Sequence, residues 1–178
     1  LDAPVQKFVP EFIESRWPVT ARQLLGHLGG VRHYRDPAEA ALKDHYWNTS
    51  DAIKLFASDP VEHEPGTKYL YTTFGYVLLG RLIENIGGCA FMDCLRENVL
   101  APAGMSSTQA DDVFRIVPNR SRGYQRTDRG EVPNCVLHDT SSKIPGGGLL
   151  STAPDLVRFA MAIDSGRLLR PESVAEMF

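Results

Sequence analysis

The sequence is organised around the stretch Tyr71-Thr72-Thr73-Phe74-Gly75-Tyr76-Val77-Leu78-Leu79-Gly80, which predicts the start of a long helix. Thr72 is the expected N-cap, because a threonine hydroxyl can accept a backbone N–H of the first helical turn. Gly87-Gly88 supplies the stop. We therefore expect a helix over residues 73–86. Its apolar residues recur at helical spacing and should lie on one stripe, namely Phe74, Val77, Leu78, Leu82 and Ile86.

Shorter helices are expected on both sides of this one, each with its own start or stop signal. Their signals are the capping-box spacing of Thr20 and Gln23 and a cap at Asn48, Thr49 or Ser50 before the stop at Asp59-Pro60. A further helix is expected over about Ala90 to Val99, broken by Ala101-Pro102-Ala103-Gly104. Thr152 caps a helix carrying Leu156, Phe159, Ala160 and Ile163, and the last helix starts at Pro171-Glu172. The segment 122–130 suggests one small hairpin. The expected fold class is mainly α with minor β.

The composition of the chain argues against several classes of function. The chain has 178 residues, 43% of them hydrophobic and 23% charged, which is the balance of one soluble globular domain. A formal charge of −3, with basic and acidic residues interspersed, leaves no basic stripe for nucleic acid. No apolar stretch approaches the roughly 20 residues of a membrane span. The five histidines have no helical i, i+4 pairing, so we expect no metal.

The cysteines and the glycine run do not indicate a metal site or a phosphate site. Cys89, Cys94 and Cys135 make an odd count without C-x-x-C spacing, which indicates neither a disulfide framework nor a zinc site, and we expect buried thiols. Gly146-Gly147-Gly148 lacks a following Gly-Lys-Ser or Gly-Lys-Thr, so it predicts close packing of the chain and not a phosphate loop. We therefore expect no cofactor.

Tyr71 is the candidate with chemical potential. A phenol at the mouth of a helix can act as a general base only where nearby cations lower its pKa. The common alternative is an amphipathic ring at a surface with a satisfied hydroxyl. Asp59, Glu62 and Glu64 precede Tyr71 in a proline-bounded loop that does not fix their separation, so we interpret them as solvated surface charge and not as a catalytic carboxylate pair.

Several segments, taken in order, resemble the serine β-lactamase-like hydrolases, which include class C β-lactamases, penicillin-binding DD-peptidases and family VIII esterases. The resemblance extends over nearly the whole chain, and the closest branch is the one containing the mitochondrial protein LACTB and its bacterial relatives. The segments are Leu1-Asp2-Ala3-Pro4-Val5, the run from His27 to Tyr34, Glu64-Pro65-Gly66, Tyr69-Leu70-Tyr71-Thr72-Thr73, Gly75 to Gly80, and Asp139 to Thr152.

The resemblance implies roles for particular residues. Tyr71 matches the tyrosine of the family's second motif, commonly Tyr-x-Asn, and would be the base or proton relay. Thr73 stands where the asparagine amide would hold the substrate, and its single hydroxyl makes a β-lactam-directed role less favoured. Gly147 and Gly148 would lie on the substrate side of the active-site floor. His27 would be a structural hydrogen-bonding residue near the site.

Two motifs of the family are absent from these 178 residues. There is no S-x-x-K, and Thr140-Ser141-Ser142-Lys143 is interpreted as a structural turn; no K-T-G or H-x-G follows Gly148. We therefore expect residues 1–178 to be the central, largely helical part of one β-lactamase-like α/β domain, inactive in isolation. The parent protein would be a serine hydrolase working through an acyl-enzyme. The alternative is a non-catalytic binding or assembly module of the same fold.

The expected partner is a small-molecule ester, peptide or β-lactam substrate, with a homo-oligomer as a further possibility. The compartment is not encoded in these residues. The resemblance implies a periplasmic or secreted protein if the source is bacterial, and a mitochondrial one if it is an animal relative of LACTB.

Overall fold

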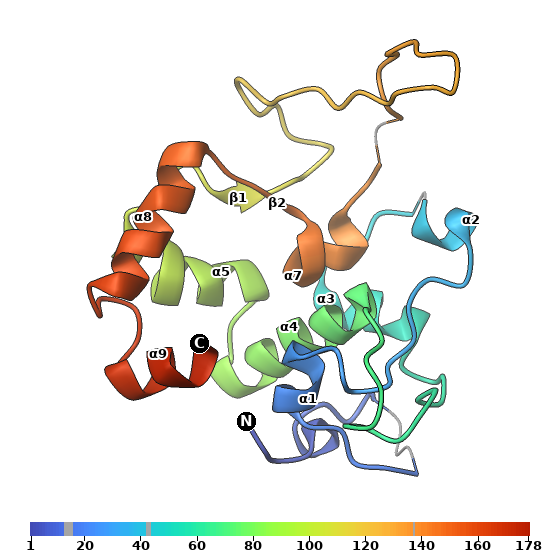
Figure 1. The fold of residues 1–178 in the computed structure, drawn as a ribbon, viewed down its shortest axis with the longest axis vertical. Helices are drawn as coiled ribbons and strands as arrows, with labels where there is room; N and C mark the ends of the chain where they lie inside the picture. The colour runs from blue at the N-terminus through green and yellow to red at the C-terminus, as the bar shows by residue number, and fades with distance from the viewer. Residues whose placement is uncertain (13–15, 42–43, 137) are drawn as a thin grey trace.

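The computed structural model describes residues 1–12, 16–41, 44–136 and 138–178, which form short helices around one long helix, α4 (Figure 1). In chain order the elements are η1 (Val5–Lys7), α1 (Ala21–Leu25), α2 (Pro37–Ala40), α3 (Thr49–Ala52), η2 (Ile53–Leu55), α4 (Thr73–Gly87), α5 (Phe91–Leu95), η3 (Arg96–Leu100), α6 (Ala101–Ala103), β1 (Gln109–Ala110), η4 (Ser141–Lys143), α7 (Ile144–Gly147), β2 (Leu149–Leu150), α8 (Ala153–Asp164) and α9 (Pro171–Met177). The predicted class, mainly α with minor β, describes this piece.

Helix α4 begins and ends where the sequence predicts. The Thr72 hydroxyl accepts the Gly75 N–H at 3.3 Å, and Gly88 closes the C-terminus in the left-handed conformation at φ 66°. The capping box of α1 at Thr20 and the cap of α8 at Thr152 are also confirmed. The predicted apolar stripe is buried over only part of its length. Burial along α4 ends at Leu82, and Ile86 is 63% exposed.

The main core surrounds the first part of α4. Phe74 and Phe56 stack with ring centroids 4.6 Å apart, and both are buried. The N-terminal segment supplies Val5, Val9 and Phe12 to the same cluster. Apolar burial from four separate stretches of sequence therefore holds α4 in place.

Glycines allow α7 to lie directly on α4. A Cβ at Gly146 would come within 3.1 Å of the Thr73 carbonyl oxygen, and a Cβ at Gly80 would collide with the ring of Pro145. A Cβ at Gly148 would lie 2.9 Å from the Thr140 carbonyl oxygen. The predicted close packing of the glycine run is therefore confirmed, and it fixes the position of the chain next to the start of α4.

The helix predicted over residues 90–99 is longer than expected. It continues from α5 through the π turn η3 into α6, and it ends at Gly104 with φ 73°. Pro102 does not break it, because the wider π turn before it changes the backbone hydrogen-bond pattern. Leu100, Ala103 and Met105 then form a second small core with Ala162 of α8.

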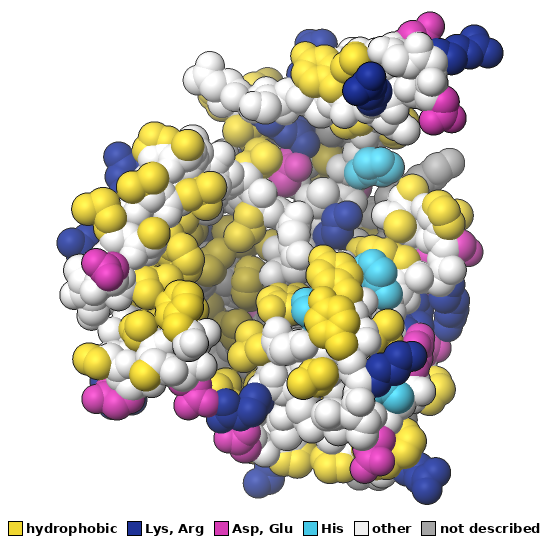
Figure 2. Space-filling view, in the orientation of Figure 1, with side chains coloured by type: hydrophobic (Ala, Val, Ile, Leu, Met, Phe, Trp, Pro, Cys, Tyr) yellow, Lys and Arg dark blue, Asp and Glu magenta, His cyan; other side chains and the backbone are white. Residues whose placement is uncertain are grey.

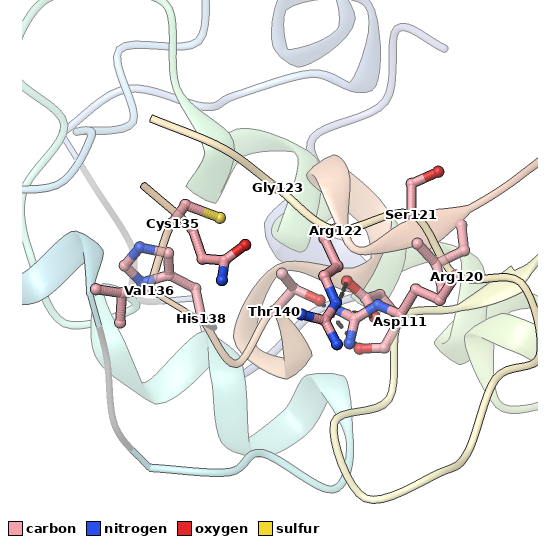
Figure 3. A pocket seen from close by; sticks show the side chains of 11 residues that line it. Asp111, Arg120, Ser121, Arg122, Gly123, Cys135, Val136, His138 and Thr140 are labelled. Atoms are coloured by element: carbon pink, nitrogen blue, oxygen red, sulfur yellow. Dashed lines mark hydrogen bonds and ion pairs between the residues drawn. The ribbon is translucent and has the colours of Figure 1, made fainter. Parts of the chain in front are cut away.

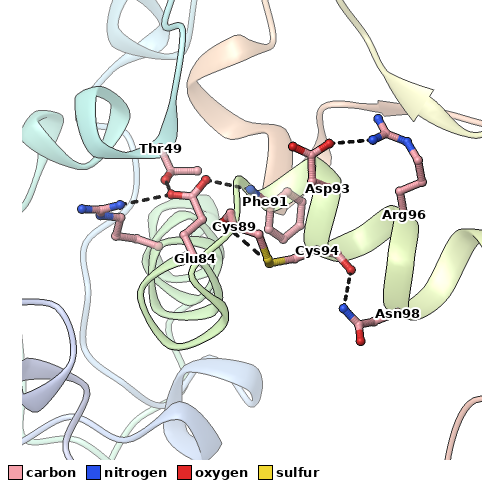
Figure 4. The surroundings of a disulfide bond; sticks show 9 residues. Thr49, Glu84, Cys89, Phe91, Asp93, Cys94, Arg96 and Asn98 are labelled. Carbon is pink, nitrogen blue, oxygen red and sulfur yellow. Dashed lines mark hydrogen bonds and ion pairs between the residues drawn. A yellow bond between two sulfur atoms is a disulfide. The ribbon is translucent and has the colours of Figure 1, made fainter.

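The prediction of three buried thiols is wrong. Cys89 and Cys94 form a disulfide with their Cα atoms 5.8 Å apart, and Cys135 is an exposed free cysteine (Figure 4). The first turn of α5 brings the pair together, although their spacing matches no common motif. Glu84 closes the same corner, because its carboxylate accepts the Phe91 N–H at 2.8 Å.

Helices α8 and α9 leave apolar side chains open. Leu156 and Phe159, which the sequence places on this helix, are 58% and 37% exposed, and Met161 is 66% exposed. Hydrophobic side chains gather over this pair of helices on the left of the molecule (Figure 2). The apolar face of α8 is therefore uncovered among the described residues, and burial on this helix is confined to Asp155 and Ala162.

Strands β1 and β2 pair antiparallel, with Gln109 opposite Leu150, and the first part of the chain between them, residues 111–136, makes a long excursion away from the helices (Figure 1). The predicted hairpin lies in this excursion. Its arms pair through the Gln125 N–H to the Pro133 carbonyl at 3.1 Å and a bridge between Tyr124 and Asn134. Over the described parts of the chain, no helix is both long and apolar enough to cross a bilayer.

Truncation of Leu78 tests the dependence of the fold on α4. Leu78 is fully buried, whereas Ile83 on the same helix is 45% exposed. Leu78→Ala should lower the free energy of unfolding by about 2–5 kcal/mol because it removes packed methyl groups. Ile83→Ala, the matched control, should cost less than about 1 kcal/mol. Urea denaturation measures both, and equal losses would contradict this account of the core.

Candidate active site

Tyr71 lies directly before the N-cap of α4, with its side chain 53% exposed. Its ring contacts two imidazoles. The centroid distance is 4.7 Å to His27 and 5.5 Å to His33, the latter edge to face. The phenol is thus open to solvent at the mouth of the helix while its ring is held from two sides.

Two backbone hydrogen bonds hold the segment that leads into Tyr71. The Leu70 N–H donates to the His27 carbonyl at 2.9 Å, and the Gly66 N–H donates to the Leu28 carbonyl at 2.8 Å. His27 has a positive φ of 57°, which few residues other than glycine adopt. The turn at His27 therefore positions both its own ring and the chain before Tyr71.

The same histidines bind the free amides at the start of α4. His27 Nδ1 accepts the Thr72 N–H at 3.3 Å, and His33 Nδ1 accepts the Thr73 N–H at 3.2 Å. These amides have no partner within the helix and need an acceptor. Since a ring nitrogen that accepts a hydrogen bond carries no proton, both rings are neutral in this arrangement, with the proton on Nε2.

The surroundings of His33 favour the neutral ring. Burial lowers the pKa of His33, and the positive charge of Lys143 lowers it further. Lys143 ends the turn η4, which confirms the structural turn predicted for residues 140–143. The sequence indicates no individual role for His33 or Lys143; the only signal for His33 is its place in the run from His27 to Tyr34 that carries the resemblance.

Thr73 and the glycine run pack together at the start of α4. Thr73 is buried, and its side chain and backbone lie against Gly146. Burial raises the pKa of the neighbouring Tyr34, while a hydrogen bond with the Thr73 side chain acts in the opposite direction. Gly148 is buried. Gly147 is exposed with φ 155° and has open space where a side chain would be.

The sequence pattern of the Beta-lactamase family matches residues 1–178, the whole chain. The chain belongs to the β-lactamase family. It is 26% identical over 92% of its length to the human mitochondrial serine β-lactamase-like protein LACTB, of which it covers 42%.

Solved structures agree with this assignment to the β-lactamase family. A D-stereospecific amidohydrolase from Streptomyces matches 99% of the chain with a TM-score of 0.83 and 25% identity, and the match covers 57% of that protein. An octameric penicillin-binding protein homologue from Pyrococcus abyssi matches with a TM-score of 0.78 and 26% identity over 99% of the chain and 42% of its own. The chain thus spans about half the length of these relatives.

A buried arginine supports the site from behind. Arg32 is 6% exposed and pairs with Glu39 at 3.0 Å and with Asp59 at 2.5 Å. Its carbonyl accepts the Thr72 hydroxyl at 2.5 Å, and its guanidinium lies 4.9 Å from the Phe74 ring centroid. Arg32 therefore links this ion-pair network to the cap of α4.

The ion pairs of Arg32 show that the prediction for Asp59 is wrong, and they account for the lowered pKa of Glu39. Asp59 is not a freely solvated charge, because it pairs with Arg32 and also with Arg35 at 2.9 Å; Glu62 and Glu64 are exposed as predicted. Burial alone would raise the pKa of Glu39, but hydrogen bonds from the Arg35 N–H and the Arg32 guanidinium lower it. In the described parts of the chain, no group of three His, Cys, Asp or Glu residues could hold a metal ion.

Substitution of His33 tests the neutral-ring arrangement. Because folding holds the pKa of His33 below its ordinary value, the unfolded chain binds a proton first as pH falls. The free energy of unfolding should therefore fall as pH drops below about 6.5, the ordinary value for histidine. In His33→Asn an amide oxygen can still accept the Thr73 N–H but does not titrate, so this decline should weaken.

Urea midpoints measured from neutral to mildly acidic pH give the comparison. The control is His138→Asn, because His138 is exposed and makes no hydrogen bond among the described residues. It should keep the wild-type decline. A decline in His33→Asn as steep as in the wild type would show that the titration of His33 is not coupled to folding.

Proposed function

We propose that this chain is the central, largely helical part of a β-lactamase-like serine hydrolase, in which Tyr71 moves a proton during acyl transfer. One observation carries the proposal: in a chain of this family, an exposed tyrosine is held at a helix start by two neutral histidines. A group positioned in this way by hydrogen-bonded neighbours is suited to general acid–base work.

The nucleophile would come from outside these residues. In the parent protein a serine of an S-x-x-K motif would attack an ester, peptide or β-lactam carbonyl, and water would release the acyl-enzyme. The lysine of that motif would supply the cation that a tyrosine base needs. Similarity to a D-stereospecific amidohydrolase favours an amide carbonyl among these substrates.

Roles for the neighbouring residues follow from their positions. Thr73 and Gly148 are buried next to the start of α4, and Gly147 leaves open space there. We assign Thr73, Gly147 and Gly148 to the substrate side, and His27 to support of Tyr71. The open apolar face of α8 and α9 would pack against the rest of the domain.

A second candidate is a non-catalytic assembly module. It is supported by the similarity to an octameric penicillin-binding protein homologue, together with the exposed apolar residues on α8. Under this alternative Tyr71 would have no chemical role, and the open face would bind another copy of the chain. Replacement of Tyr71 in the complete protein distinguishes the enzyme from the assembly module.

Replacement of Tyr71 in the complete parent protein tests the enzymatic role. Tyr71→Phe removes only the hydroxyl and should lower kcat at least about a hundredfold, as the loss of a general acid–base group does. Tyr69→Phe is the matched control, because Tyr69 is 63% exposed and contacts the same His27 ring. A decrease of less than about threefold for Tyr71→Phe would remove Tyr71 from the mechanism.

Labelling tests the absence of a nucleophile from these residues. The purified 19.7 kDa chain, treated with a fluorophosphonate that modifies activated serines, should show no added mass by intact mass spectrometry. The complete parent protein should gain one adduct. An adduct mapped to a serine of residues 1–178 would contradict the assignment of the nucleophile to another part of the protein.

A further inference from the structure

A cavity of about 530 Å³ lies inside the excursion between β1 and β2, apart from Tyr71 and the glycine floor (Figure 3). Its volume is in the range of small-molecule sites, about 300–1,000 Å³. Backbone pairing holds its walls together, because the Cys135 N–H donates to the Gly123 carbonyl at 2.9 Å. We call it the Arg122 cavity.

The Arg122 cavity has more positively than negatively charged side chains around it. Arg120 and Arg122 both line it, and in Figure 3 both side chains extend toward the carboxylate of Asp111. Asp111 pairs with Arg120 at 2.8 Å. Arg122 has no ion pair or hydrogen bond among the described residues. One carboxylate thus faces two guanidinium groups, and a positive charge is left over beside the cavity.

The remaining lining divides into donors and an apolar side. Ser121 and Asn134 line the cavity, and their side chains make no hydrogen bond within the described part of the chain. Val136 and Leu150 add apolar surface. A guanidinium forms strong, often bidentate hydrogen bonds to a carboxylate, and nearby amide and hydroxyl donors can complete its shell.

From this arrangement we propose that the Arg122 cavity binds a small organic carboxylate with an apolar body. The carboxylate pairs with Arg122 and is within the reach of donors such as Asn134. The apolar body lies against Val136 and Leu150. This site is independent of the function proposed for Tyr71, since none of its residues contacts that side chain.

Cys135 provides a built-in reporter, because it lines the cavity and the other two cysteines form the disulfide. Its thiolate attacks one sulfur of an aromatic disulfide reagent, forming a new S–S bond and releasing the other half as a thiolate. We compare dithiobis(nitrobenzoate), which carries two carboxylates, with the neutral dithiodipyridine. The quantity measured is the ratio of the two reaction rates with the 178-residue chain at low salt.

Arg122→Gln should lower this rate ratio at least about fivefold, because the anionic reagent loses its electrostatic recruitment. Arg126→Gln is the matched control: Arg126 is exposed on the same excursion but does not line the cavity, and the ratio should change less than about twofold. Equal ratios for the two variants would overturn the proposal. Arg122 is exposed and unpaired, and thermal melts should confirm that its replacement leaves folding unchanged.

Competition on the wild-type chain gives a second test that needs no variant. Phenylpropionate should slow the reaction of Cys135 in a saturable way, whereas the neutral phenylpropanamide should not. Equal protection by both compounds would overturn the role of the carboxylate. Protection by inorganic phosphate equal to that by phenylpropionate would overturn the role of the apolar body.

Discussion

The hydrogen bonding of the first amides of α4 is the constraint on which this structure depends. A helix start leaves backbone N–H groups without intrahelical partners, and their burial without acceptors would be costly. Here the acceptors are the rings of His27 and His33 and the hydroxyl of Thr72. The two histidines lie 45 and 40 positions before the amides that they bind, so these bonds align the turn at His27 with the start of the long helix.

The same bonds connect folding with the candidate site. Tyr71 precedes the capped residue, so its backbone cannot move without disturbing the amides of α4. Arg32 adds a connection from behind, since its carbonyl accepts the Thr72 hydroxyl and its side chain joins a partly buried ion-pair network. The site is therefore rigid in its backbone while the Tyr71 side chain remains open to solvent, which suits a group that must meet a substrate.

Local signals made much of the fold predictable. Caps at Thr20, Thr72 and Thr152 and the stop at Gly88 act within a single turn, so the sequence alone indicates them. The degree of burial on α8 is not determined by its own sequence, because a helical stripe shows which face is apolar but not whether a partner covers it. The disulfide between Cys89 and Cys94 depends on how α5 begins, and the spacing of the residues carries no signal for it.

The candidate site was predictable only in part. The motif around Tyr71 indicated the tyrosine and the adjacent Thr73. The acceptor role of His33 arises from tertiary contact across forty positions of sequence. The unpaired positive charge at Arg122 likewise depends on the pairing of Asp111 with Arg120. No local pattern of sequence predicts which arginine pairs with Asp111.

The two short strands have a consequence for how relatives of this chain can diverge. They pair beside the base of the excursion, where the Thr140 hydroxyl also donates to the Asp111 carbonyl at 3.2 Å, so the ends of the excursion stay close together. The entropy of closing a loop grows only slowly with its length, and surface loops tolerate insertions. Related proteins could lengthen or shorten this segment, and so acquire new binding surfaces, without disturbing the helix start that holds Tyr71.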